Sequence, residues 1–180
     1  MATPRFIALE RFDPSDGEKW HSYTQWANIP ALEEVISLDT SLCPRIIREF
    51  GPDDWAQSMH ADVAIDYFSN LEYLLQRVAG TPRKNILGLY RNPEAPIDQS
   101  PGAGEFVFVG YDLIEELTQI SALTNCGGFP NSFSNSELNK YGLIETFDRA
   151  AELKIQLKVR NPEEAHANCE LYAVWRMEVD

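Results

Sequence analysis

The feature of this sequence that most constrains its fold is an apolar run, Phe106–Ile114, which leads into a polar, glycine-containing loop. Phe106 and Phe108 alternate with Val107 and Val109, so a strand here would be apolar on both faces. A strand of that kind is usually covered on both sides by other parts of the protein. We therefore expect Phe106–Ile114 to be a central, buried strand.

Apolar residues elsewhere predict further strands and one long helix. The strands are expected at Arg5–Phe12, Asn85–Tyr90 and Glu170–Val179, with a short partner strand at Ile120–Leu123. Apolar residues at helical spacing predict a helix over Asp62–Val78, which Gly80 and Pro82 would end.

Three other segments are less uniform in pattern. Leu143–Val159 is predicted to be a second long helix, although Leu153–Val159 also alternates with the period of a strand, so both structures stay open there. Glu18–Pro30 fits a short helix or an aromatic-rich loop. Ser134–Gly142 has the S-x-x-E spacing of a capping box and is predicted to be one short helix, which Gly142 would close.

Together these elements predict a single α+β domain over residues 1–180, with a largely antiparallel sheet and two main helices. A chain of 180 residues is long enough to bury a substantial core in one domain. Its 15 basic and 28 acidic residues give a net charge of −13. Such a charge repels nucleic acid and anionic membranes and favours encounter with basic partners.

The expected compartment is the cytoplasm. The sequence has no apolar run of the roughly 18 to 20 residues that a membrane span needs, and its start does not read as a signal peptide. Its three cysteines, Cys43, Cys126 and Cys169, are an odd number and should remain free thiols under reducing conditions.

Cys126 is the first candidate for chemistry, because it lies in the run Asn125, Cys126, Gly127, Gly128 before Pro130. A nucleophilic cysteine needs a lowered pKa and a base, and His166 or His60 are the possible bases. No cysteine-hydrolase signature accompanies it, and the glycines suggest a turn that needs backbone freedom. We therefore interpret Cys126 as structural and keep a small enzyme as the alternative.

Other site types find less support in the residues. His166 and Cys169 are three positions apart and Cys126 could join them in space, but zinc usually takes four ligands, often from C-x2-C pairs, and we predict no metal. Gly102-Ala103-Gly104 does not complete a dinucleotide loop, so no cofactor is predicted. Asp112, inside the apolar run, should pair with an arginine such as Arg176 or accept backbone hydrogen bonds.

A set of acidic residues near one tryptophan is the candidate partner-binding surface. It comprises Asp53, Asp54, Trp55, Asp62 and Asp66. Acidic side chains steer a basic partner during encounter, and a large aromatic residue is a frequent anchor in interfaces. We expect these residues to contact a basic protein, with neither nucleic acid nor a membrane as partner. Homodimer formation through an exposed sheet edge is a further possibility.

The segment SALTNCGGFPNSFSNSELNKYGLI, with HANCELYAVWR near the end of the chain, resembles small uncharacterised bacterial cytoplasmic proteins of immunity-protein type. The resemblance covers roughly the last 75 residues and assigns no catalytic residue. It implies a protein that neutralises a basic toxin domain by covering its active site. Together with the acidic charge, it gives this binding role as the first functional hypothesis; a structural or assembly protein remains an alternative.

Overall fold

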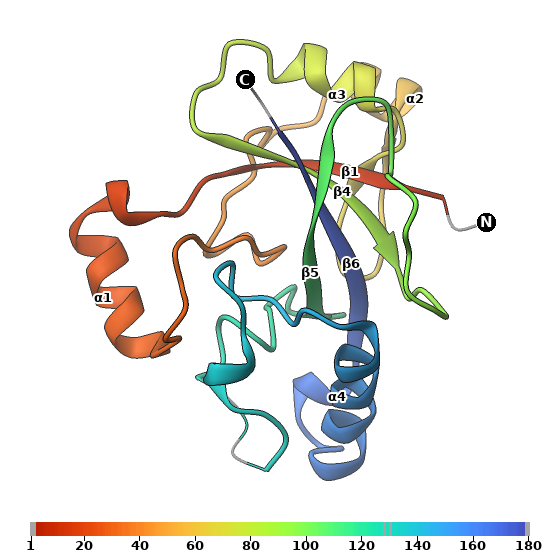
Figure 1. Cartoon of the computed structure of the whole chain (residues 1–180). Helices are drawn as coiled ribbons and strands as arrows, with labels where there is room; N and C mark the ends of the chain where they lie inside the picture. Colours follow the sequence, from red (N-terminus) through yellow and green to blue (C-terminus); the bar gives the residue numbers. More distant parts are fainter. Residues whose placement is uncertain (1–2, 128, 130, 179–180) are drawn as a thin grey trace.

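A six-stranded antiparallel sheet forms the centre of the fold, in the strand order β2-β3-β1-β4-β6-β5. Strands β1, β4, β5 and β6 are labelled in Figure 1. The computed structural model describes residues 3–127, 129 and 131–178. This architecture confirms the predicted α+β domain. The strands are β1 Arg5–Glu10, β2 Met59–His60, β3 Tyr67–Phe68, β4 Lys84–Arg91, β5 Phe106–Glu115 and β6 Cys169–Met177.

The helices lie beside different parts of the sheet. Helices α2 and α3 lie near β1, β2 and β3, whereas α4 packs against β5 and β6 (Figure 1). Among the described helices, none combines the length and the apolar character needed to cross a bilayer. The α-helices are α1 Glu18–Ala27, α2 Pro52–Gln57, α3 Leu71–Arg77 and α4 Phe147–Arg160, and the 3-10 turns are η1 Pro14–Asp16, η2 Asn135–Glu137 and η3 Ala165–Ala167.

The expectation of a central position for the apolar run is wrong, because β5 lies at one end of the sheet and pairs along its length only with β6 among the described strands. Its outer edge is covered by the following loop. The backbone of Tyr111 exchanges hydrogen bonds with Ile144, and Leu113 accepts one from Ala122. The side-chain amide of Asn139 donates to the carbonyl of Val109. The part of the run from Val109 to Leu113 is therefore covered by a loop where a further strand was expected, whereas Val107 stays 45% exposed.

The helix predicted over Asp62–Val78 is shorter than its apolar spacing suggests. Tyr67–Phe68 pairs in the sheet as β3, and the helix α3 begins only at Leu71. Asn70 ends the extended segment, because its side-chain oxygen accepts the backbone N–H of Tyr73 and so caps the helix.

The open segment Leu153–Val159 is helical and belongs to α4. Ala150, Leu153 and Leu157 face the core, while Ile155 and Val159 are exposed. The capping box of Ser134 and Glu137 is present, but it opens only the 3-10 turn η2. The predicted strand Ile120–Leu123 is reduced to one bridge between Ser121 and Ile114.

Two buried acidic residues attach the loop after α1 to the sheet. Asp112 accepts hydrogen bonds from the backbone N–H groups of Leu38 and Leu113. It also accepts from the hydroxyls of Ser37 and Ser121. The expectation that this residue accepts backbone hydrogen bonds is therefore correct. Burial raises the pKa of this carboxyl. Arg176 instead donates to Glu34, which also accepts from Arg11 and Asn85.

Candidate functional site

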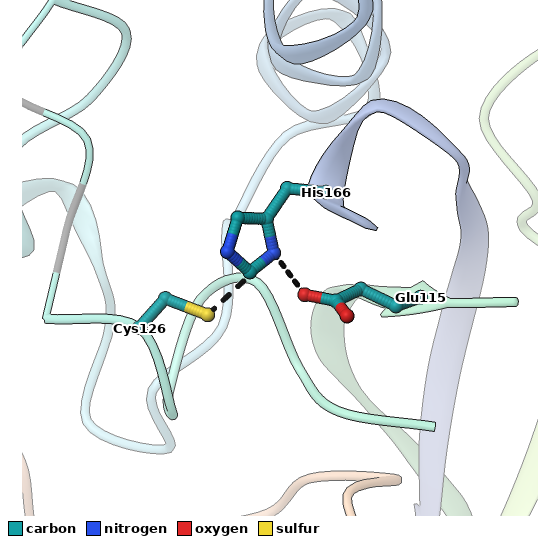
Figure 2. Close-up of side chains that lie close together, drawn as sticks. All are labelled: Glu115, Cys126 and His166. Carbon is teal, nitrogen blue, oxygen red and sulfur yellow. Dashed lines mark hydrogen bonds and ion pairs between the residues drawn. The ribbon is translucent and has the colours of Figure 1, made fainter. Parts of the chain in front are cut away.

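Three segments that are distant in sequence bring a carboxylate, a thiol and an imidazole together (Figure 2). Glu115 is the last residue of β5, Cys126 lies in the loop that follows, and His166 belongs to η3. The Cys126 Sγ is 3.7 Å from the His166 Nδ1, which also contacts the Glu115 Oε1. One potential ligand atom from each residue lies within 4.8 Å of the other two.

Hydrogen bonds and sheet pairing hold each member of this trio. Glu115 is opposite Cys169 in the β5–β6 pair, and its Oε2 accepts the hydroxyl of Thr118. The Cys126 thiol donates to the carbonyl of Ser121 over 3.4 Å. Phe129 packs edge-on against the His166 ring, with centroids 4.6 Å apart. The trio is thus placed by the sheet and the local turns.

The neighbouring Asn125 fixes the loop that carries the cysteine. Its side-chain amide donates to the Asp39 Oδ2 over 2.9 Å and to the Ser41 hydroxyl over 3.1 Å. Gly127 has a positive φ of 69° and is exposed beside Trp26, which accords with the expected need for backbone freedom. Gly128 and Pro130 of the predicted loop lie outside the described residues.

The electrostatics of the trio oppose a nucleophilic role for the cysteine. Burial, and after it the negative charges of Glu115 and Asp39, raise the pKa of the Cys126 thiol to about 12. The thiol is therefore neutral near pH 7, whereas attack requires the thiolate. In addition, Glu115 and Cys126 both face Nδ1, whereas a catalytic triad uses the two ring nitrogens for its two partners.

Glu115 is the most unusual member of the trio because its side chain is only 2% exposed. Its Oε1 contacts the imidazole, yet it accepts no hydrogen bond of acceptable geometry from the described residues. A buried carboxylate oxygen without a hydrogen bond is unfavourable unless a cation offsets its charge.

The other residues considered for chemistry lie apart from this arrangement or serve the fold. His60 is on β2, at the opposite end of the sheet from β5, where it stacks on Tyr67 and bonds the Ser69 hydroxyl. It therefore cannot serve as a base for Cys126. The thiol of Cys169 donates to the carbonyl of His166 over 3.2 Å and so stabilises η3.

The predicted partner-binding residues separate into exposed and internal ones. Asp53 and Trp55 are on the surface of α2, but Asp54 is buried and pairs with Arg77 and Tyr73 of α3.

The remaining two members of that set also have internal contacts. Asp62 pairs with Arg5 and Arg91, so its carboxylate links β1 and β4. Asp66 is partly buried, and its backbone carbonyl accepts from the Arg45 guanidinium over 3.0 Å. The five residues therefore do not form one continuous free acidic surface.

The sequence interpretation identified Cys126 and His166 but missed Glu115. The available signal was an acidic residue directly after the apolar run, at the point where the chain leaves the sheet. Its relation to the other two depends on the path of a long loop, which residue spacing does not reveal.

No protein-family model, curated protein or solved structure matches this chain.

Proposed function

We propose that this chain is a binding protein of immunity-protein type, which covers the active site of a basic toxin domain. The observation that carries the proposal is the distribution of charge. Ten of the 15 basic residues are held in ion pairs with the chain's own carboxylates. The positive groups are largely occupied internally, while the net charge of −13 leaves many carboxylates for attraction of a basic partner.

The best-supported contact region is the α2–α3 face, which we define by Asp53, Trp55 and Glu72. These residues are exposed, and neither Asp53 nor Glu72 has an ion-pair partner among the described residues. Asp54 connects the two helices through Arg77 and Tyr73, which gives the face a fixed geometry. Trp55 is 47% exposed on the same helix as Asp53 and provides a candidate aromatic anchor.

Binding kinetics with the co-expressed product of the adjacent gene test the proposal. Neutralising two carboxylates in Asp53→Asn/Glu72→Gln should slow association at low salt, with little change at high salt, because the steering field is screened. The matched control Glu94→Gln/Glu163→Gln removes the same charge from exposed positions elsewhere. It should slow association less.

The aromatic anchor should affect dissociation instead. Trp55→Ala should raise the dissociation rate by roughly thirtyfold, equivalent to about 2 kcal/mol for a central aromatic contact. Trp26→Ala, which truncates a similarly exposed tryptophan on α1, is the control. If no basic protein is retained, or if binding is indifferent to salt and to the Asp53/Glu72 changes, the proposal is wrong.

A second candidate function is a small enzyme that uses Cys126 as nucleophile and His166 as base. The 3.7 Å approach of their side chains favours it. The raised pKa of the thiol opposes it, because the thiolate is scarce at neutral pH. We therefore place the binding role first.

A further inference from the structure

The trio has two properties that suggest a cation. Glu115 directs a buried carboxylate oxygen, without an adequate hydrogen bond from the described residues, toward a thiol and an imidazole. These residues also supply one oxygen, one sulfur and one nitrogen donor from three separate segments (Figure 2). Buried charges in proteins are usually paired or coordinate a metal.

The spacing of the sulfur and nitrogen donors fits tetrahedral zinc, whereas the Glu115 Oε1 contacts Nδ1 directly and would turn away from it to bind the ion. Usual bond lengths of about 2.3 Å to sulfur and about 2.0 to 2.1 Å to nitrogen place these two ligand atoms about 3.6 Å apart at a tetrahedral angle. The distance between the Cys126 Sγ and the His166 Nδ1 is 3.7 Å. Mixed carboxylate, imidazole and thiolate ligation is within the normal range for zinc, and three protein ligands leave one position for water.

We propose that Glu115, Cys126 and His166 bind one zinc ion, with water as the fourth ligand. In the bound state Glu115 is a carboxylate and Cys126 a thiolate, so the two negative charges balance the charge of Zn²⁺. The thiol proton passes to solvent when the zinc–sulfur bond forms, and no oxidation or reduction occurs. The neutral His166 donates the lone pair of Nδ1.

The surrounding contacts support this assignment. Thr118 donates to the Glu115 Oε2 and thereby orients the carboxylate, which leaves Oε1 directed at the imidazole. Phe129 restricts the His166 ring, and the Cys169 thiol holds the carbonyl of the same residue. Such outer contacts usually orient metal ligands. The His166 side chain is 20% exposed and Cys126 is only partly buried, which gives an ion and a water access to the site.

The proposed ion would connect three segments that are distant in sequence. It would tie the loop containing Cys126 to the end of β5 and to η3, while the α2–α3 face lies near the other edge of the sheet. Zinc binding is therefore separate from the proposed partner surface, and either inference can fail without the other.

The test uses the full chain without a histidine tag, stripped with a chelator and titrated with Co²⁺ and then Zn²⁺. Wild type should bind one Co²⁺ and show the near-ultraviolet charge-transfer band of a cobalt–thiolate bond together with intense tetrahedral visible bands. Cys126→Ser should lose the thiolate band. Glu115→Gln and His166→Ala should each weaken Zn²⁺ binding by roughly tenfold or more, at least the usual effect of an altered outer-shell group.

Matched controls distinguish the site from incidental binding. Cys43→Ala and His60→Ala remove the same donor types outside the trio and should leave the spectrum and affinity unchanged. Glu115→Gln is also the folding control, because its neutral amide removes a buried charge and should leave the metal-free melting temperature equal or higher.

Several results would overturn the zinc assignment. The first is Co²⁺ binding without a thiolate band, and the second is a Zn²⁺ affinity that does not change in Glu115→Gln or His166→Ala. The third is a number of bound metal ions that falls in His60→Ala. Any of them would leave the three side chains as a local hydrogen-bonding group with no metal function. A zinc-induced rise in melting temperature that vanishes in Glu115→Gln would support the site by a readout independent of the spectrum.

Discussion

Replacing Glu34 with alanine should destabilise the fold strongly, because this one carboxylate joins three parts of the chain. It comes from the loop after α1 and accepts hydrogen bonds from Asn85 of β4, Arg176 of β6 and Arg11 after β1. The distances run from 2.8 to 3.1 Å. Glu34 is only 5% exposed, so its carboxylate is almost fully removed from water and depends on these donors.

The magnitude follows from the exposure of each donor. Arg11 is 40% exposed and can turn to solvent, so its part of the loss should be below about 1 kcal/mol. Arg176 is 21% exposed and Asn85 is buried, and hydrogen bonds to a charged group contribute about 1.5 to 3 kcal/mol each. Allowing for non-additivity, Glu34→Ala should lower the free energy of unfolding by about 3 to 5 kcal/mol.

Urea denaturation followed by tryptophan fluorescence measures this loss. The midpoint should fall by about 1 to 2 M without a change in slope. Glu34→Gln keeps one acceptor oxygen but places an NH2 group against arginine donors, so it should lose roughly half as much. A loss below about 1 kcal/mol for Glu34→Ala, at unchanged slope, would refute the view that this network secures the loop to the sheet.

Three further predictions concern the backbone, acid stability and thiol reactivity. In denaturation experiments, Gly110→Ala should lower the free energy of unfolding by about 3 kcal/mol or more, because Gly110 has φ 138° and an added Cβ would lie 2.9 Å from the Ile144 carbonyl oxygen. The control Gly80→Ala, at a position with φ 76° and open space, should lower it by only about 1 kcal/mol. Burial alone would raise the pKa of Glu170, but hydrogen bonds from Arg91 and Asn92 outweigh it and lower that pKa to about 2. The ionised Glu170 therefore stabilises the fold by an amount on the order of 3 kcal/mol above pH 4.5, and this stabilisation is lost as the pH falls toward 2. Glu170→Gln should flatten this part of the curve of unfolding free energy against pH. An unchanged curve would contradict the assignment. In metal-free protein, alkylation of Cys126 monitored by mass spectrometry should be slow at pH 7 and still accelerate above pH 9, whereas a fast reaction below pH 7 would favour the enzyme alternative.

The class of the fold could be predicted from local patterns, but the neighbours of each element could not. The apolar pattern of the sequence correctly located β1, β4 and β6, because every second residue of a strand lies on the same face of the sheet. The same pattern misplaced β5, since apolar faces reveal that a strand is covered but not whether a strand or a loop pairs with its edge. The sequence of Leu153–Val159 fits both the helical and the strand period. In the structure the segment is helical, and Leu153 and Leu157 pack into the core.

The candidate sites were harder to predict because their pairings span long stretches of chain. Asp54 and Asp62 look like surface acids in sequence, yet Arg77 and Arg91 bind them inside the folded protein. Cys126 and His166 were identified by residue type alone. Glu115 was missed because the loop after β5 must fold back before its carboxylate has the other two as neighbours.

The covered edge of β5 has a consequence for association between copies of this protein. A sheet edge with free backbone groups invites another strand to add, which is a common route to dimers and aggregates. Here the loop already occupies the outer backbone groups of Tyr111 and the carbonyl of Leu113, and the opposite end of the sheet is formed by β2, only two residues long. Strand addition along the Val109–Leu113 part of β5 would first require this loop to detach, so we expect this part of the sheet edge not to mediate association between copies.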